Sequence, residues 1–133
     1  MNVHLIKVVA SINNIKTFRE LSGVTKKELA RLLNVTVHTY SAYEVDNNAI
    51  PAVIGVMLSM IYKISIYELF CPYEQVEKKS LDYIMRLRSL ETSTRFDILS
   101  YNILGNSDHK PTYHWIQEVK ERIRDEIMEI DEH

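Results

Sequence analysis

The stretch that most constrains the fold covers residues 25–44 and reads TKKELARLLNVTVHTYSAYE. Thr25 followed by Glu28 is a capping-box pattern, which marks the start of a helix just ahead of an apolar run. Asn34 stands where that helix must stop, because asparagine tolerates the left-handed backbone conformation that a helix end often needs. Thr36 is then a suitable N-cap for a second helix. The pattern predicts a helix-turn-helix, whose second helix can enter the major groove of DNA.

Composition indicates a soluble, mainly helical chain. Hydrophobic residues make up 46% and charged residues 26% of the 133 residues, with only three Gly and three Pro. The single Cys71 excludes an internal disulfide and a cysteine-rich zinc site, which favours a reducing compartment. The sequence lacks a basic leader, a small-residue cleavage site and the roughly 20 apolar residues that a transmembrane helix requires. We therefore expect a cytoplasmic protein that does not contact a membrane.

Charge is unevenly distributed along the chain. Residues 1–70 have seven Lys/Arg and five Asp/Glu, which gives a net charge of +2. Residues 71–133 have nine Lys/Arg and thirteen Asp/Glu, which gives −4 and a total of −2. The basic bias falls on the part that contains the helix-turn-helix. This distribution gives weak support for a polyanionic partner such as DNA.

The rest of the chain reads as further helices. Residues 3–9 fit either a helix or a short edge strand, and we favour a helical or irregular lead-in. The other predicted helices cover residues 11–21, 51–62, 66–70, 74–90, 94–104 and 113–130. The segment 51–62 has no charged side chain, so either later parts of the chain cover it, which we favour, or a partner does. We expect an all-α protein with a helix-turn-helix domain over residues 1–71 and a helical segment over residues 72–133.

Further residues before, within and after the motif follow a characteristic spacing. They are Phe18-Arg19, Gly23-Val24-Thr25, Glu28-Leu29-Ala30, Leu33, Val35-Thr36, Tyr43-Glu44, Ile66 and Glu68-Leu69-Phe70. With these residues, the chain from 12 to 70 resembles the helix-turn-helix domain of the Xre family, which includes the phage lambda-type repressors and Cro. The resemblance implies a bundle of five short helices that binds operator DNA, usually as a dimer. It also implies an ion pair between Arg19 and Glu44.

Four positions depart from the pattern of that family. Lys26 and Asn34 stand where the family often has Gln and Gly. Val45 replaces an Asn that usually helps to hold the DNA backbone, and phosphate would repel Asp46 beside it. The residues Val45 and Asp46 therefore weaken the expected grip on the DNA backbone.

The motif and the resemblance together predict which side chains face DNA. Lys26 lies at a helix N-terminus, where anions are favoured, so it is the strongest candidate for a phosphate contact. No base-facing position carries Arg, Gln or Asn, although His38 can donate to guanine and Val37 or Ala42 can touch a thymine methyl group. The predicted DNA-binding residues are Lys26, Lys27, Thr36, Val37, His38, Thr39, Ser41 and Ala42.

These observations favour a sequence-specific transcriptional regulator, a repressor, that binds double-stranded DNA as a dimer. The chain has no nucleophile motif, phosphate-binding loop or paired-carboxylate site, so we expect neither enzymatic activity nor a cofactor. His109 and His114 lack the pattern of a metal site. The alternative that stays open is a protein-interaction or antitoxin-like module with weak or no DNA binding, because the base-reading face is poor and the C-terminal half is acidic.

The helix predicted over residues 113–130 offers a surface for joining two copies. Its apolar residues form a narrow seam with steps of three, four, four and three, namely Ile116, Val119, Ile123, Ile127 and Ile130. We expect a homodimer held mainly by this seam, or a protein partner bound through the C-terminal helices. The alternative is that the helix folds back over the apolar segment 51–62 of its own chain.

Overall fold

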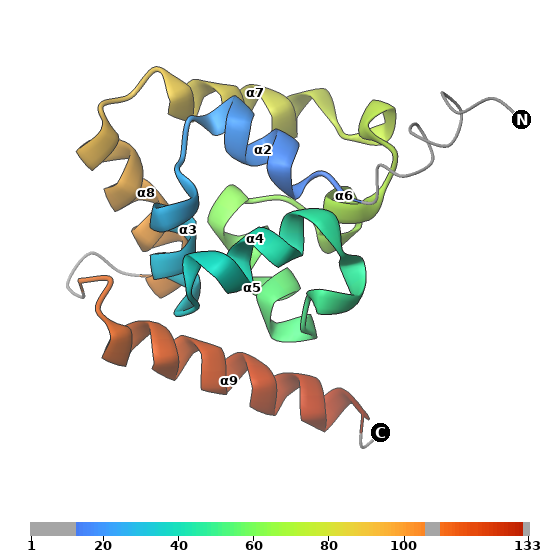
Figure 1. Cartoon of the computed structure of the whole chain (residues 1–133), viewed down its shortest axis with the longest axis vertical. Helices are drawn as coiled ribbons and strands as arrows, with labels where there is room; N and C mark the ends of the chain where they lie inside the picture. Colours follow the sequence, from blue (N-terminus) through green and yellow to red (C-terminus); the bar gives the residue numbers. More distant parts are fainter. Residues whose placement is uncertain (1–12, 106–109, 132–133) are drawn as a thin grey trace, which may run out of the picture.

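The computed structural model describes residues 13–105 and 110–131, and every regular element within these ranges is helical (Figure 1). The elements are α2 (Ile15–Ser22), α3 (Lys26–Leu33), α4 (Val37–Val45), η1 (Asn47–Ala49), α5 (Ala52–Tyr62), α6 (Ile66–Phe70), η2 (Tyr73–Gln75), α7 (Lys78–Arg88), α8 (Thr92–Leu104) and α9 (Tyr113–Asp131). The all-α fold class is therefore confirmed. The lead-in over residues 3–9 lies outside the described residues, as does the start of the helix expected from residue 11.

The helix-turn-helix formed by α3 and α4 is surrounded by helices from both halves of the chain. In Figure 1, α2 and α7 lie side by side along one edge of the molecule and α9 runs along the opposite edge. Helix α5 packs against α6, α8 and α9, and α3 also touches α8 and α9. The motif is thus braced by elements that follow it in sequence.

Side-chain caps explain where the two helices of the motif begin and end. The Thr25 hydroxyl accepts a hydrogen bond from the N–H of Glu28, whose carboxylate accepts one from the N–H of Thr25, so the predicted capping box is present. Asn34 ends α3 with φ of 53° and ψ of 47°, the predicted left-handed conformation. Thr36 caps α4 by accepting a hydrogen bond from the N–H of Thr39. The local signals therefore placed both helices correctly.

The helix predicted over residues 74–90 is wrong at its start. The structure has the 3-10 helix η2, a break, and then α7. The carboxylate of Glu68 in α6 accepts hydrogen bonds from the N–H of Glu77 at 3.0 Å and from the hydroxyl of Ser80 at 3.2 Å. These bonds accompany an extended backbone at Val76, whose side chain is buried. A contact with an earlier helix therefore overrides the apolar pattern of this segment.

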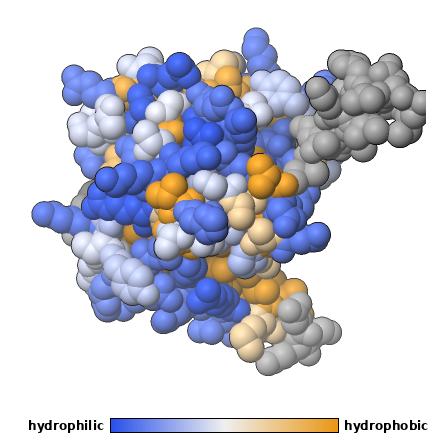
Figure 2. Space-filling view, in the orientation of Figure 1, coloured by the Kyte–Doolittle hydropathy of each residue, from blue (hydrophilic) through white to orange (hydrophobic). Residues whose placement is uncertain are grey.

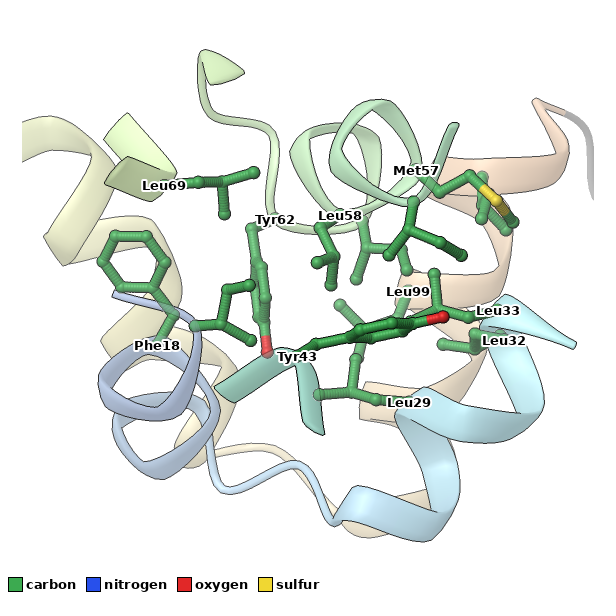
Figure 3. Packing of buried hydrophobic residues seen from close by; sticks show 14 of the residues in the cluster. Phe18, Leu29, Leu32, Leu33, Tyr43, Met57, Leu58, Tyr62, Leu69 and Leu99 are labelled. Carbon is green, nitrogen blue, oxygen red and sulfur yellow. The ribbon is translucent and has the colours of Figure 1, made fainter. Parts of the chain in front are cut away.

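One hydrophobic core extends across residue 71. Figure 3 shows Phe18 and Tyr43 from the first helices in the same cluster as Leu58 of α5 and Leu99 of α8. The cluster also includes buried side chains of α7 and α9. The helices after residue 71 therefore complete the core of the helices before it.

The apolar seam of α9 faces the interior, so the expected dimer contact is wrong for most of its length. Ile116, Val119 and Ile123 are 0%, 4% and 6% exposed, and Ile127 is half-buried against the same core. Of the five seam residues, Ile130 alone is exposed. The physical reason is that the uncharged helix α5 needs an apolar cover, which α9 supplies by packing on it. The alternative in which the helix folds back over its own chain is confirmed.

Candidate nucleic-acid interface

A largely buried ion pair fixes α4 against α2. The Nε of Arg19 lies 2.6 Å from Oε2 of Glu44, and its Nη2 lies 3.1 Å from Oε1, so the pair is bidentate. The hydroxyl of Tyr40 donates to Oε2 of Glu44 at 2.7 Å. The pair that the resemblance implies is therefore formed. Because Tyr40 and Glu44 both belong to α4, these bonds fix the rotation of α4 about its own axis.

The same contacts determine the charges of the groups involved. Burial works to raise the pKa of Glu44, but hydrogen bonds from Arg19 and Tyr40 outweigh it and leave the pKa below its ordinary value of 4.5. The hydrogen bond with Glu44 raises the pKa of Arg19. Burial raises the pKa of Tyr40. At neutral pH the cluster therefore consists of a carboxylate, a guanidinium and an uncharged phenol.

The predicted base-reading positions lie at or near the surface. Val37, His38 and Thr39 are exposed, whereas Ser41 and Ala42 are half-buried. In the view of Figure 2, hydrophobic side chains near the centre stand among mainly hydrophilic ones, and a more extended hydrophobic area lies at the lower right. The outer side of α4 is thus accessible, but its hydrogen-bonding groups are one imidazole and two hydroxyls, without the Arg, Gln or Asn that suit bidentate base contacts.

The residues predicted to contact the DNA backbone differ in how the structure holds them. A hydrogen bond holds the ammonium group of Lys26 at α4, whereas Lys27 and Thr36 are exposed. The Nζ of Lys26 donates to the hydroxyl of Ser41 at 3.3 Å, which brings the start of α3 and one flank of α4 together. Lys27 is exposed on the same helix. The exposed Thr36 uses its hydroxyl to cap α4 and to contact Thr39 at 2.9 Å. Of the predicted cations Lys26 and Lys27, Lys26 is therefore the one that a hydrogen bond joins to α4.

Helix α9 holds the turn of the motif through hydrogen bonds that sequence reasoning missed. The side-chain amide of Asn34 donates to the backbone carbonyl of Tyr113 at 2.9 Å. The Nζ of Lys120, a residue only 6% exposed, donates to the carbonyl of Leu33 at 2.9 Å. Burial lowers the pKa of Lys120, and the nearby charge of Arg124 lowers it further. Helix α9 therefore braces both the end of α3 and the turn.

Arginine side chains join the loop after α2 to the later helices. The buried Arg95 of α8 donates to the carbonyls of Gly23 and Leu87, each at 2.9 Å. Arg88 of α7 donates to the carbonyl of Glu20 at 2.6 Å. These bonds satisfy carbonyl groups near helix ends, which lack partners within their own helices. They hold α2, α7 and α8 together beside the motif.

Sequence reasoning could not find these hydrogen bonds from Asn34, Lys120 and the two arginines, because their acceptors are backbone carbonyls far away in the chain. A signal was present at Asn34, since an amide where the resemblance leads one to expect Gly can form a hydrogen bond that Gly cannot. No comparable signal marks Lys120 or Arg95, which look like ordinary charged residues of helices with polar faces.

Two short helices around a tight turn, with the second helix fixed in rotation and exposed outward, define a DNA-binding helix-turn-helix regulator. Residues 15–69 match a family model described as Helix-turn-helix. This match supports the resemblance of residues 12–70 to the Xre family of lambda-repressor-type helix-turn-helix proteins. Neither a curated protein nor a solved structure matches the chain.

The described residues contain neither a metal-ion cluster nor a membrane-spanning helix. Across residues 13–105 and 110–131, no group of three or more His, Cys, Asp or Glu side chains could hold a metal ion. His109 lies outside these ranges, and His114 has its Nε2 3.4 Å from Oε1 of Glu118. No helix in the described part of the chain combines the length and apolar character needed to cross a membrane.

Proposed function

We propose that the chain is a cytoplasmic transcriptional repressor that binds specific DNA sites as a dimer, with α4 in the major groove. The observation that carries this proposal is the arrangement of α4, which is accessible on its outer side, fixed by Arg19 and Glu44, and flanked by Lys26. Such a helix meets base edges with its N-terminal residues, while neighbouring cations meet phosphates.

The dimer in this proposal follows from the chemistry of the reading face. Val37, His38 and Ala42 offer few hydrogen bonds, so one copy discriminates weakly between base pairs. Two copies on half-sites about one helical turn apart, roughly 34 Å, would double the number of contacts. Because the inner part of α9 is buried, we expect the copies to meet at exposed apolar groups such as Met128 and Ile130, which are 59% and 73% exposed.

DNA titration tests the proposal. A labelled duplex of about 24 base pairs, enriched from a random library with the full chain, covers two half-sites and is compared with an unselected duplex. Lys26→Ala should weaken binding to both duplexes by a similar factor and make the salt dependence shallower by about one unit. His38→Ala should instead reduce the preference for the enriched duplex. Lys78→Ala, which removes an exposed charge from the start of α7, is the control.

The same titration can reject α4 as the reading helix. Tight binding to the enriched duplex that is unaffected by changes at Val37, His38 and Ala42 would remove α4 from that role. Sedimentation of the complex gives the number of copies per duplex, and a single copy at saturation would contradict the dimer.

A second function has one observation in its favour. Val37 and Val45 are 43% and 71% exposed, so α4 presents apolar groups to solvent, and the exposed Asp46 follows them. Apolar groups beside a negative charge suit a protein surface better than a phosphate strand. The second candidate is therefore a protein-interaction or antitoxin-like module that keeps the fold. A folded full chain that binds neither duplex at low salt would favour this second function.

A further inference from the structure

Different parts of the chain occupy the two flanks of α4. Ser41 and Thr39 are two positions apart, so their side chains project about 200° apart around the helix axis. Lys26 lies on the Ser41 flank, where it donates its hydrogen bond. On the other flank, Thr39 lines a groove of about 740 Å³ together with residues 111–113. His38 projects between the two flanks.

The start of α9 is held in this position by the turn of the motif. The amide of Asn34 donates to the carbonyl of Tyr113 at 2.9 Å and lies 3.4 Å from Oε1 of Gln117. One turn further along, Lys120 donates to the carbonyl of Leu33 at 2.9 Å. Because these acceptors and donors belong to the end of α3 and the turn, the start of α9 is attached to the turn that leads into α4.

The chemistry of residues 110–114 suits a phosphate strand. Lys110 provides an exposed cation and Thr112 and Tyr113 provide exposed hydroxyl groups, whereas the exposed His114 faces the carboxylate of Glu118 at 3.4 Å. No acidic residue occurs between Lys110 and Glu118. Groups of this kind donate hydrogen bonds to phosphate oxygens and position a protein on DNA without reading its sequence.

We infer that residues 110–114 contact the sugar-phosphate strand on the wall of the major groove opposite the wall that Lys26 meets. The groove is about 12 Å wide and has a phosphate strand on each side, so elements on both flanks of a seated helix approach a strand. The inference rests on the proposed function, because it requires α4 in the groove. Since these residues lie outside the matched residues 15–69, the DNA interface extends beyond the family domain.

The salt dependence of binding tests this inference with the full chain. The probe is a labelled duplex of about 24 base pairs of mixed sequence, titrated between about 50 and 200 mM salt. Lys110→Ala removes one phosphate contact, so the plot of log K against log salt should become shallower by about one unit and the affinity should fall about threefold or more. Lys78→Ala removes the same charge at the start of α7, on the opposite edge of the molecule from α9 (Figure 1), and should leave the slope unchanged.

A second variant addresses the hydroxyl groups. Tyr113→Phe removes the exposed hydroxyl but keeps the backbone carbonyl that Asn34 contacts. It should weaken binding about two- to threefold with little change in the salt slope, because a neutral donor displaces no counterion. Thermal unfolding of both variants should match that of the wild type, since both side chains are exposed.

The outcomes separate this inference from the proposed function. If Lys26→Ala makes the salt slope shallower but Lys110→Ala and Tyr113→Phe bind like the wild type, the inference is overturned and the proposed function stands. Tighter binding by Lys110→Ala or Tyr113→Phe would mean that the segment obstructs the groove, which also overturns the inference. If the wild-type chain does not bind the duplex at the lowest salt concentration, both proposals fail.

Discussion

Glu44 is the residue on which the orientation of α4 depends most. Without its carboxylate, the Arg19 guanidinium, whose side chain is 16% exposed, loses its bidentate partner. Breaking a partly buried pair from one side costs about 3 kcal/mol or more. We therefore expect Glu44→Ala to lower the free energy of unfolding by about that amount in urea titrations. Glu20→Ala removes an exposed carboxylate from α2 and should cost less than about 0.5 kcal/mol, so equal losses would contradict the assignment.

Two buried carboxylates make the stability of the chain sensitive to acid. Burial works to raise the pKa values of Glu44 and Glu68, but hydrogen bonds, first from Arg19 and from the N–H of Glu77 respectively, hold both below the ordinary 4.5. A carboxyl group whose pKa is lower in the folded chain stabilises it fully above the unfolded pKa. This contribution is lost as the pH falls through the folded value.

The melting temperature should therefore fall as the pH is lowered from about 5 to about 3. Circular dichroism melts in a pH series measure this dependence. Glu44→Gln cannot titrate at this position, so its melting temperature should change less over the same range. A wild-type melting temperature that stays constant down to pH 3 would contradict the lowered pKa values.

At the scale of the element, α9 acts as an internal cover for α5. Ile123 is 6% exposed and Ile130 is 73% exposed on the same helix, which makes them a matched pair. Ile123→Ala should cost about 2–5 kcal/mol of unfolding free energy, because it leaves a cavity in the core. Ile130→Ala should change the stability of the monomer by less than about 0.5 kcal/mol. If Ile123→Ala left the free energy of unfolding unchanged, α9 would not cover α5 in solution.

Local sequence signals were sufficient for the elements whose ends are fixed by neighbouring residues. The capping boxes at Thr25 and Ser65 begin α3 and α6 at the expected positions, and Gly105 ends α8 in the left-handed conformation with φ of 78°. The failure before α7 arose because Glu68 bonds to residues nine and twelve positions later. A pattern of apolar residues cannot report such a contact.

Some features of the candidate site could likewise be predicted from the sequence, and others could not. The accessible positions of α4 and the partners Arg19 and Glu44 could be predicted, because the motif and the resemblance specify them. The seam of α9 was recognised as an apolar surface, yet periodicity does not say whether such a surface packs on a second copy or on the same chain. The clamp between Asn34 and Tyr113 depends on the tertiary fold and could not be derived from spacing.

At the scale of the whole molecule, the shared core predicts one cooperative unfolding transition. Trp115 is the sole tryptophan and lies in α9, so its fluorescence reports on the C-terminal helix, whereas far-ultraviolet circular dichroism reports on all helices. Because one cluster of buried side chains connects α2 with α9, both signals should change at the same urea concentration. An earlier transition in fluorescence would show that α9 detaches while the other helices remain folded.

The long separation between Leu33 and Lys120, 87 positions, also has a consequence while the chain is being made. Helices α3, α4 and α5 leave the ribosome well before α9, and synthesis proceeds at about 5–20 residues per second. The nascent chain therefore exposes the uncharged α5 for several seconds, during which a chaperone can bind it. The hydrogen bonds from α9 to the turn before α4 can form only at the end of that interval.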